Sequence, residues 1–155
     1  MPIAKLRDST CSVARSLSVL GERWTLLIVR EALSGTTRFE AFRENLGVAA
    51  DVLSERLSTL VECGVMHRDA YQVAGRRTQY EYSLTEIGRE LHVVVGALQQ
   101  WGDQNLPLPE GPSVSRRSKK SSTPVRVAFV DEAGREVPND DVVVVDTVAG
   151  PVSGR

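Results

Sequence analysis

Two adjacent arginines offer the clearest binding chemistry in this sequence. Arg76 and Arg77 lie in the segment AGRRT, residues 74–78, where glycine and polar residues predict a turn between two strand-like runs. Guanidinium groups on an exposed turn can bind DNA phosphates or enter the minor groove. Taken alone, the same pair would also suit a merely solvated turn.

Arg38 and Arg56 are two further candidates for contact with nucleic acid. Arg38 comes just before a short predicted helix, where it could bind phosphate, although a packing or ion-pair role is equally compatible. Arg56 lies on the polar face of the next predicted helix and is its one long donor able to read guanine. It could equally pair with Glu55 or with a phosphate.

Cys11 is a candidate redox sensor. It stands at the expected start of a helix, where the dipole favours the thiolate. The alternative is a small buried apolar residue. Cys63 and His67 supply only two ligand types across a predicted helix-to-strand break, so we expect no metal site. No catalytic constellation or cofactor motif is present, which predicts a protein that is not an enzyme and needs no cofactor.

The helix that carries Arg56 organises the chain. Leu53, Leu57 and Leu60 form one apolar stripe over about residues 49–63, and the opposite face is short or charged. Three shorter helices are predicted before it, ending at Gly21, Gly35 and Gly47. A hairpin over about residues 65–84 follows, in which Val65 and His67 share one face. The alternative is a core helix in an ordinary small α+β domain.

A long helix is predicted from Thr85 to about Gln104, with Thr85 as its cap. Its apolar stripe runs from Ile87 to Trp101 and needs a large apolar partner, either the domain's own core or a second subunit.

The chain is expected to contain four segments. Residues 1–10 form a flexible arm, 11–106 the main domain, 107–124 a Pro/Ser-rich linker, and 125–155 a C-terminal β-hairpin extension. In the extension, Val125, Val127 and Phe129 are expected to pair with a strand over residues 142–145. Because an isolated hairpin is marginal in water, this one should dock on the main domain or on a partner.

Composition limits the function classes. The net charge is −1, so any basic surface must be local. The sequence shows no membrane span and no secretory signal, and two cysteines make no disulfide framework, which predicts a cytoplasmic protein.

The sequence resembles the HxlR-type family of bacterial transcriptional regulators, which are relatives of MarR. The similarity runs from Cys11 to about Trp101. It is carried by Leu20-Gly-Glu-Arg-Trp-Thr-Leu-Leu-Ile, Arg38-Phe39, Leu53-Ser-Glu-Arg-Leu, Glu62-Cys-Gly, Tyr80-Glu-Tyr-Ser-Leu-Thr-Glu-Ile-Gly and Trp101-Gly. The opening Ala49-Ala50-Asp51 replaces the Ser-Pro-Arg-like start usual in the family, so an operator sequence cannot be carried over.

The resemblance implies a mainly α fold with a β-hairpin wing, an α+β winged helix-turn-helix. It also implies a homodimer that binds double-stranded DNA at pseudo-palindromic operators, with helix 49–63 in the major groove and the wing on the backbone or minor groove. The DNA-binding candidates are Arg38, Ala50, Asp51, Val52, Ser54, Glu55, Arg56, Arg76, Arg77 and Thr78. The dimer candidates from the first and last helices are Val13, Leu17, Ile87, Leu91, Val94, Val95, Leu98 and Trp101.

The expected function is therefore a DNA-binding transcriptional regulator, acting as a repressor. Some family members use the cysteine matching Cys11 as a thiol switch, and others respond to small molecules. Two rivals remain: a small-molecule or thiol-redox sensor with weak or no DNA binding, and a winged helix that binds protein.

Overall fold

The computed structural model describes residues 6–112 and 114–145. The first half of the expected N-terminal arm and the last ten residues of the extension lie outside this range. The chain divides into two compact units, one ending at Gln99 and one starting at Gln100. The division falls inside the last long helix, whereas the sequence suggested a boundary after residue 106.

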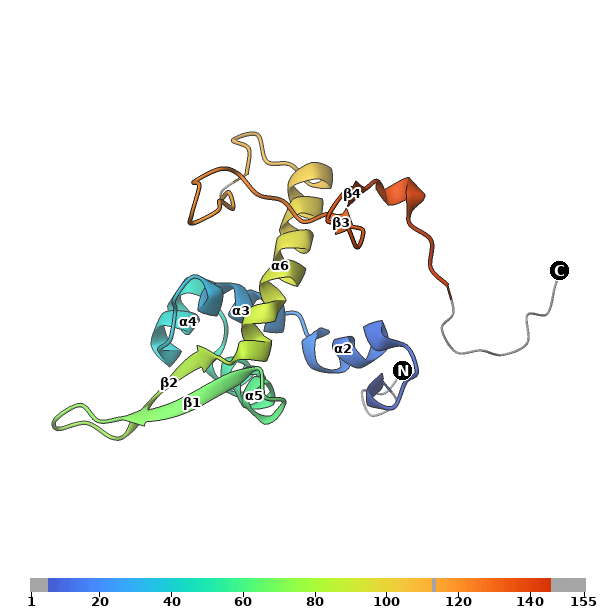
Figure 1. Cartoon of the computed structure of the whole chain (residues 1–155). Coiled ribbons are helices and arrows are strands. Elements are labelled where there is room, and N and C mark those ends of the chain that lie inside the picture. The colour runs from blue at the N-terminus through green and yellow to red at the C-terminus, as the bar shows by residue number, and fades with distance from the viewer. Residues whose placement is uncertain (1–5, 113, 146–155) are drawn as a thin grey trace. The chain divides into compact units, whose positions relative to one another are not determined.

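Helices α2 to α5 precede the hairpin in the described part of the first unit, as the apolar spacing predicted, and Figure 1 labels them in chain order. Their ends follow local chemistry: Gly21 caps the first, and Gly47, with φ +63°, ends the third in the left-handed region that glycine tolerates. The helices are α2 (Ser12–Leu20), α3 (Thr25–Leu33), α4 (Phe39–Leu46) and α5 (Ala50–Glu62).

The core of this unit lies between α3, α4, α5 and the hairpin that follows. Leu53, Leu57 and Leu60 are completely buried, which confirms the apolar stripe of α5. They pack in one cluster with Ile28 of α3 and Phe42 of α4. The polar face of α5 is consequently turned away from the core.

The predicted hairpin consists of β1 (Met66–Tyr71) and β2 (Gln79–Leu84), which pair antiparallel with Met66 opposite Leu84. The predicted alternation of buried and exposed residues is wrong at the start of the hairpin. Val65 and Met66 are both buried and His67 is exposed, because β1 begins only at Met66, after Val65 has packed into the core.

Helix α6 (Glu86–Asn105) follows β2 and is capped as predicted. The Thr85 hydroxyl accepts a hydrogen bond from the Gly88 amide at 3.1 Å and donates to the Gly64 carbonyl at 2.6 Å. At Gly88 the helix passes so close to the residue before β1 that an added Cβ would lie 2.1 Å from the Val65 carbonyl oxygen. This contact fixes the start of α6 against the hairpin.

The second unit contains a hairpin, but not the one predicted. Its strands are β3 (Phe129–Val130) and β4 (Glu136–Val137). The Asp131 amide donates to the Arg135 carbonyl and the Asp131 carboxylate accepts from the Ala133 and Arg135 amides, so the chain reverses at once. Residues 142–145 therefore lie outside the ladder, with Val144 97% exposed.

Within the second unit, the extension contacts the end of α6. The side-chain amide of Gln100 donates to the Val127 carbonyl at 3.0 Å and accepts from the Val127 backbone amide at 3.1 Å. Phe129 and Val130 stay exposed, so the apolar face of the hairpin is not buried by these contacts. In the described ranges, no helix combines the length and apolar character that a membrane crossing requires.

Candidate nucleic-acid interface

The outward face of α5 is exposed and carries acceptors rather than cations. Ala50, Asp51, Ser54 and Glu55 are all exposed, while the leucines opposite are buried. Ala49, the residue before the helix, makes no side-chain cap, in keeping with the unusual opening seen in the sequence. Asp51 in the first turn complements the positive end of the helix dipole, which gives it a structural role as well.

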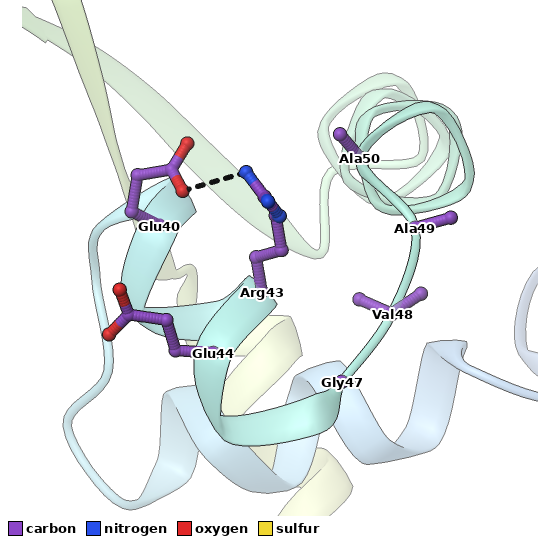
Figure 2. Close-up of a pocket in the computed structure, with 7 residues that line it drawn as sticks. All are labelled: Glu40, Arg43, Glu44, Gly47, Val48, Ala49 and Ala50. Carbon is purple, nitrogen blue, oxygen red and sulfur yellow. Dashed lines mark hydrogen bonds and ion pairs between the residues drawn. The ribbon is translucent and has the colours of Figure 1, made fainter.

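An open groove of about 670 Å³ separates α4 from the start of α5. Figure 2 shows Arg43 rising from α4 beside this groove, with its guanidinium turned to Glu40 at 3.1 Å. Glu44 and the turn Gly47–Ala50 complete the lining. The α4 side of the groove is polar and carries two glutamates. Among the described residues that line the groove, Arg43 is the only cation, and it is paired with Glu40.

Arg56 does not project freely as a base-reading side chain. Its Nη2 lies 3.6 Å from a Glu22 oxygen and 3.5 Å from a Glu55 oxygen, and its side chain is only 18% exposed. Of the alternatives that the sequence left open, the structure places it in ion pairs. Glu22, in the connection before α3, was not singled out from the sequence, because nothing local indicates a partner so distant along the chain.

Val52 is only partly available for contact with DNA. It is half-buried and packs against the core. As the residue between exposed Asp51 and buried Leu53, it lies at the edge of the α5 polar face, and only part of its surface is available.

The wing tip is exposed and basic. Arg76, Arg77 and Thr78 are all exposed, and no ion pair joins either guanidinium to another residue in the parts of the chain that the structure describes. Gly75, with φ +77°, makes the turn, which is closed by the Arg76 amide bonding the Val73 carbonyl at 3.0 Å. The two arginines therefore project from a defined turn.

Arg38 connects the wing to α4. Its Nε lies 3.2 Å from a Glu81 oxygen of β2, and its guanidinium lies over the Tyr71 ring at 5.2 Å. The Tyr82 amide also donates to the Thr37 carbonyl at 2.7 Å. Arg38 thus has the ion-pair role that the sequence left open, yet its side chain is still largely accessible.

Glu31 fixes α3 to α4. Its carboxylate accepts from Asn45 at 2.9 Å and from Arg30 at 2.7 Å, and lies 3.3 Å from the Thr36 hydroxyl. Burial works to raise the pKa of Glu31, but the hydrogen bonds from Asn45, Arg30 and Thr36 together lower it below the ordinary value of 4.5. The charged form of Glu31 therefore stabilises the contact between α3 and α4.

The predicted dimer residues separate into two groups. Leu98 and Trp101 are 51% and 60% exposed, and four others are exposed with them: Val13, Leu17, Ile87 and Val94. Val95 is only 7% exposed and belongs to the core, and Leu91 packs partly against it. We therefore correct the assignment of Val95, because its side of α6 faces the core of this chain. Leu91 packs partly against the same core.

Cys11 immediately precedes α2 and is exposed, and its side chain makes no cap bond. Cys63 ends α5, is half-buried, and has its Sγ 3.7 Å from an Arg7 guanidinium nitrogen. Both thiols are free. No group of three metal-binding side chains is found among the residues described.

Similarity to known proteins agrees with this geometry. Residues 19–110 match the HxlR-like helix-turn-helix family model. Rv3095 of Mycobacterium tuberculosis, named an uncharacterized HTH-type transcriptional regulator, is 49% identical over 106 residues. The match covers 68% of this chain and 66% of Rv3095, so the chain spans slightly less than two thirds of that relative.

Two solved structures extend the comparison. PA1607, described as a candidate transcription factor, is 36% identical with a TM-score of 0.77 and covers 91% of this chain and 98% of its own. That share is larger than residues 1–106 could supply, so it includes much of the second unit. The reduced form of the redox regulator HypR is 31% identical with a TM-score of 0.57, covering 64% of this chain and 98% of its own. With the matched family model spanning more than half of its length, this chain belongs to the HxlR-like helix-turn-helix family.

Proposed function

We propose that this chain is a dimeric, sequence-specific DNA-binding transcriptional regulator that acts as a repressor. One observation carries the proposal: the exposed face of α5 and the basic wing tip belong to one unit, in which the Arg38–Glu81 pair ties the wing to α4. In this arrangement α5 enters the major groove, while Arg76 and Arg77 bind phosphates or the minor groove. Arg38, Thr78 and the exposed edge of Val52 contribute around them.

The recognition chemistry of α5 is that of hydrogen-bond acceptors. Asp51 and Glu55 are exposed at its start, and Arg56 is held by Glu22. Carboxylates accept a hydrogen bond from the cytosine amino group, whereas arginine is suited to guanine. Ser54 can bind either kind of edge. We expect α5 to read amino groups through Asp51 and Glu55, while the wing supplies affinity without sequence preference.

A second copy of the chain would place two such units on a pseudo-palindromic site. The exposed apolar residues of α2 and α6, among them Leu17, Leu98 and Trp101, offer a surface for that pairing. Their burial would contribute roughly 25 cal/mol per Å².

Selection of bound sites from a randomised DNA duplex tests this function. The wild-type chain should enrich an inverted repeat, since the two recognition helices would be related by a twofold axis. Asp51→Asn should change the preferred base at one position of each half-site toward adenine, because asparagine pairs with the adenine edge. Enrichment of no sequence by the wild-type chain would contradict sequence-specific binding.

A thiol-sensing role is the second candidate, favoured by the exposure of Cys11 at the start of α2 and by the similarity to HypR, a redox regulator. DNA affinity before and after diamide treatment, in wild type and Cys11→Ser, tests it. Equal wild-type affinity in both conditions would assign Cys11 a purely structural role.

A further inference from the structure

A compact basic loop lies in the second unit, in the segment that the sequence suggested was only a linker. Residues 116–120 read Arg-Arg-Ser-Lys-Lys, and no Asp or Glu occurs between Glu110 and Asp131. Lys119 and Lys120 are exposed. Within the described ranges, no ion pair joins either ammonium group to another residue. The charges of these two lysines in the segment 116–120, named the basic loop, are therefore not neutralised by an ion pair.

The basic loop has a defined backbone. The Val125 amide donates to the Arg116 carbonyl at 3.0 Å, and the Ser118 amide donates to the Thr123 carbonyl at 2.9 Å. The Ser118 hydroxyl accepts from the Lys120 and Ser121 amides, both at 3.2 Å. These bonds satisfy the polar groups of the turn internally, which leaves the two ammonium groups available to an external anion.

The charges of the first unit point to DNA phosphate as the anion that the basic loop binds. In the first unit, Arg38, Arg43 and Arg56 are each paired with a glutamate, and Asp51 of α5 adds negative charge. The whole chain has a net charge of −1. DNA affinity depends on the number of phosphates neutralised by protein cations. The wing tip alone would supply only two unpaired adjacent guanidinium groups.

We propose that the basic loop is a second DNA-phosphate contact, in which Lys119 and Lys120 bind the backbone of duplex DNA. This contact rests on the proposed function, because it adds affinity to a DNA complex that α5 and the wing direct. It carries no base specificity, since ammonium groups bound to phosphates do not read sequence.

The experiment uses the full chain and a mixed-sequence duplex of about 40 base pairs, with affinity measured at several salt concentrations. In Lys119→Gln/Lys120→Gln, the slope of log affinity against log salt should flatten by about two units. The ratio of wild-type to variant DNA affinity should then fall about tenfold between about 50 and 200 mM salt. Lys119→Arg/Lys120→Arg keeps the charge and should keep the wild-type slope.

An unchanged slope in the glutamine variant would overturn the contact. Single-stranded RNA of equal length serves as a second probe, and a loss confined to RNA would likewise overturn it, by showing a different partner. If wild-type affinity for the duplex does not depend on salt, the proposed function fails together with the loop. If wild type shows a steep slope that the glutamine variant keeps, only the loop fails. Thermal melting should show all variants folded, because both lysines are exposed.

Discussion

The Arg56 guanidinium lies 3.6 Å from the Glu22 carboxylate, so the one cation of α5 is held by the connection before α3. This pair turns a donor that could read guanine into a positioning group. The surface that α5 offers to DNA is consequently set in part by a residue outside the helix.

Glu22→Gln should loosen Arg56, which then keeps only the ion pair with Glu55 on its own helix, and should change which bases α5 prefers. We expect guanine to gain preference at one position of each half-site, because a guanidinium no longer held by Glu22 can bind it in bidentate fashion, worth about 1–3 kcal/mol. Site selection from random DNA measures this. Glu132→Gln changes the net charge equally in the second unit and should leave the selected sequence unaltered. An identical site for wild type and Glu22→Gln would show that the pair does not control readout.

Leu98→Asp should separate the proposed dimer without unfolding the protomer. Leu98 is half exposed in the single chain, whereas a carboxylate in an apolar interface would cost several kcal/mol. Sedimentation velocity would then show a monomer. Val144→Asp, at an exposed residue of the extension, is the matched control and should remain dimeric. A dimeric Leu98→Asp protein would exclude this face of α6 as the interface.

Gly88→Ala should destabilise the first unit. The added Cβ would lie 2.1 Å from the Val65 carbonyl oxygen, so backbone must move, at a cost of about 1–3 kcal/mol. Gly102→Ala lies in the same helix with nothing within 4 Å, and should stabilise by about 0.5–1 kcal/mol. Thermal melting compares the two. Equal or higher stability of Gly88→Ala would contradict the close approach of α6 to the hairpin.

The Glu31 carboxylate should give the fold an acid-sensitive component. Its pKa is lowered in the folded state, so its stabilisation is complete above the ordinary pKa of 4.5 and is lost as pH falls through the lower folded value. At neutral pH, Glu31→Gln should therefore melt at a lower temperature than wild type. In acid, this difference in melting temperature should become smaller. A melting difference that does not change with pH would mean that ionisation of Glu31 is unimportant.

The helices and the wing could be predicted from the sequence because their signals are local. Leucines at helical spacing and the glycine at residue 47 define α5 and the end of α4, and both predictions are confirmed. The α+β winged-helix class follows from the same order of elements.

Pairings between distant segments could not be predicted in the same way. The partner of Arg56, the burial of Val65 and the close approach at Gly88 all depend on segments brought together only by folding. In the second unit, the valine run at 142–145 suggested a strand, but the turn at Asp131 pairs β3 with β4 before the chain reaches it.

The salt dependence of DNA binding tests the central claim most directly, by comparing wild type with Arg76→Ala/Arg77→Ala. Both arginines are exposed at the wing tip, so their loss should leave melting unchanged. The account predicts a steep wild-type slope of log affinity against log salt, flattened by up to about two units in the variant. A wild-type affinity that is independent of salt, or a variant slope equal to that of wild type, would contradict the account.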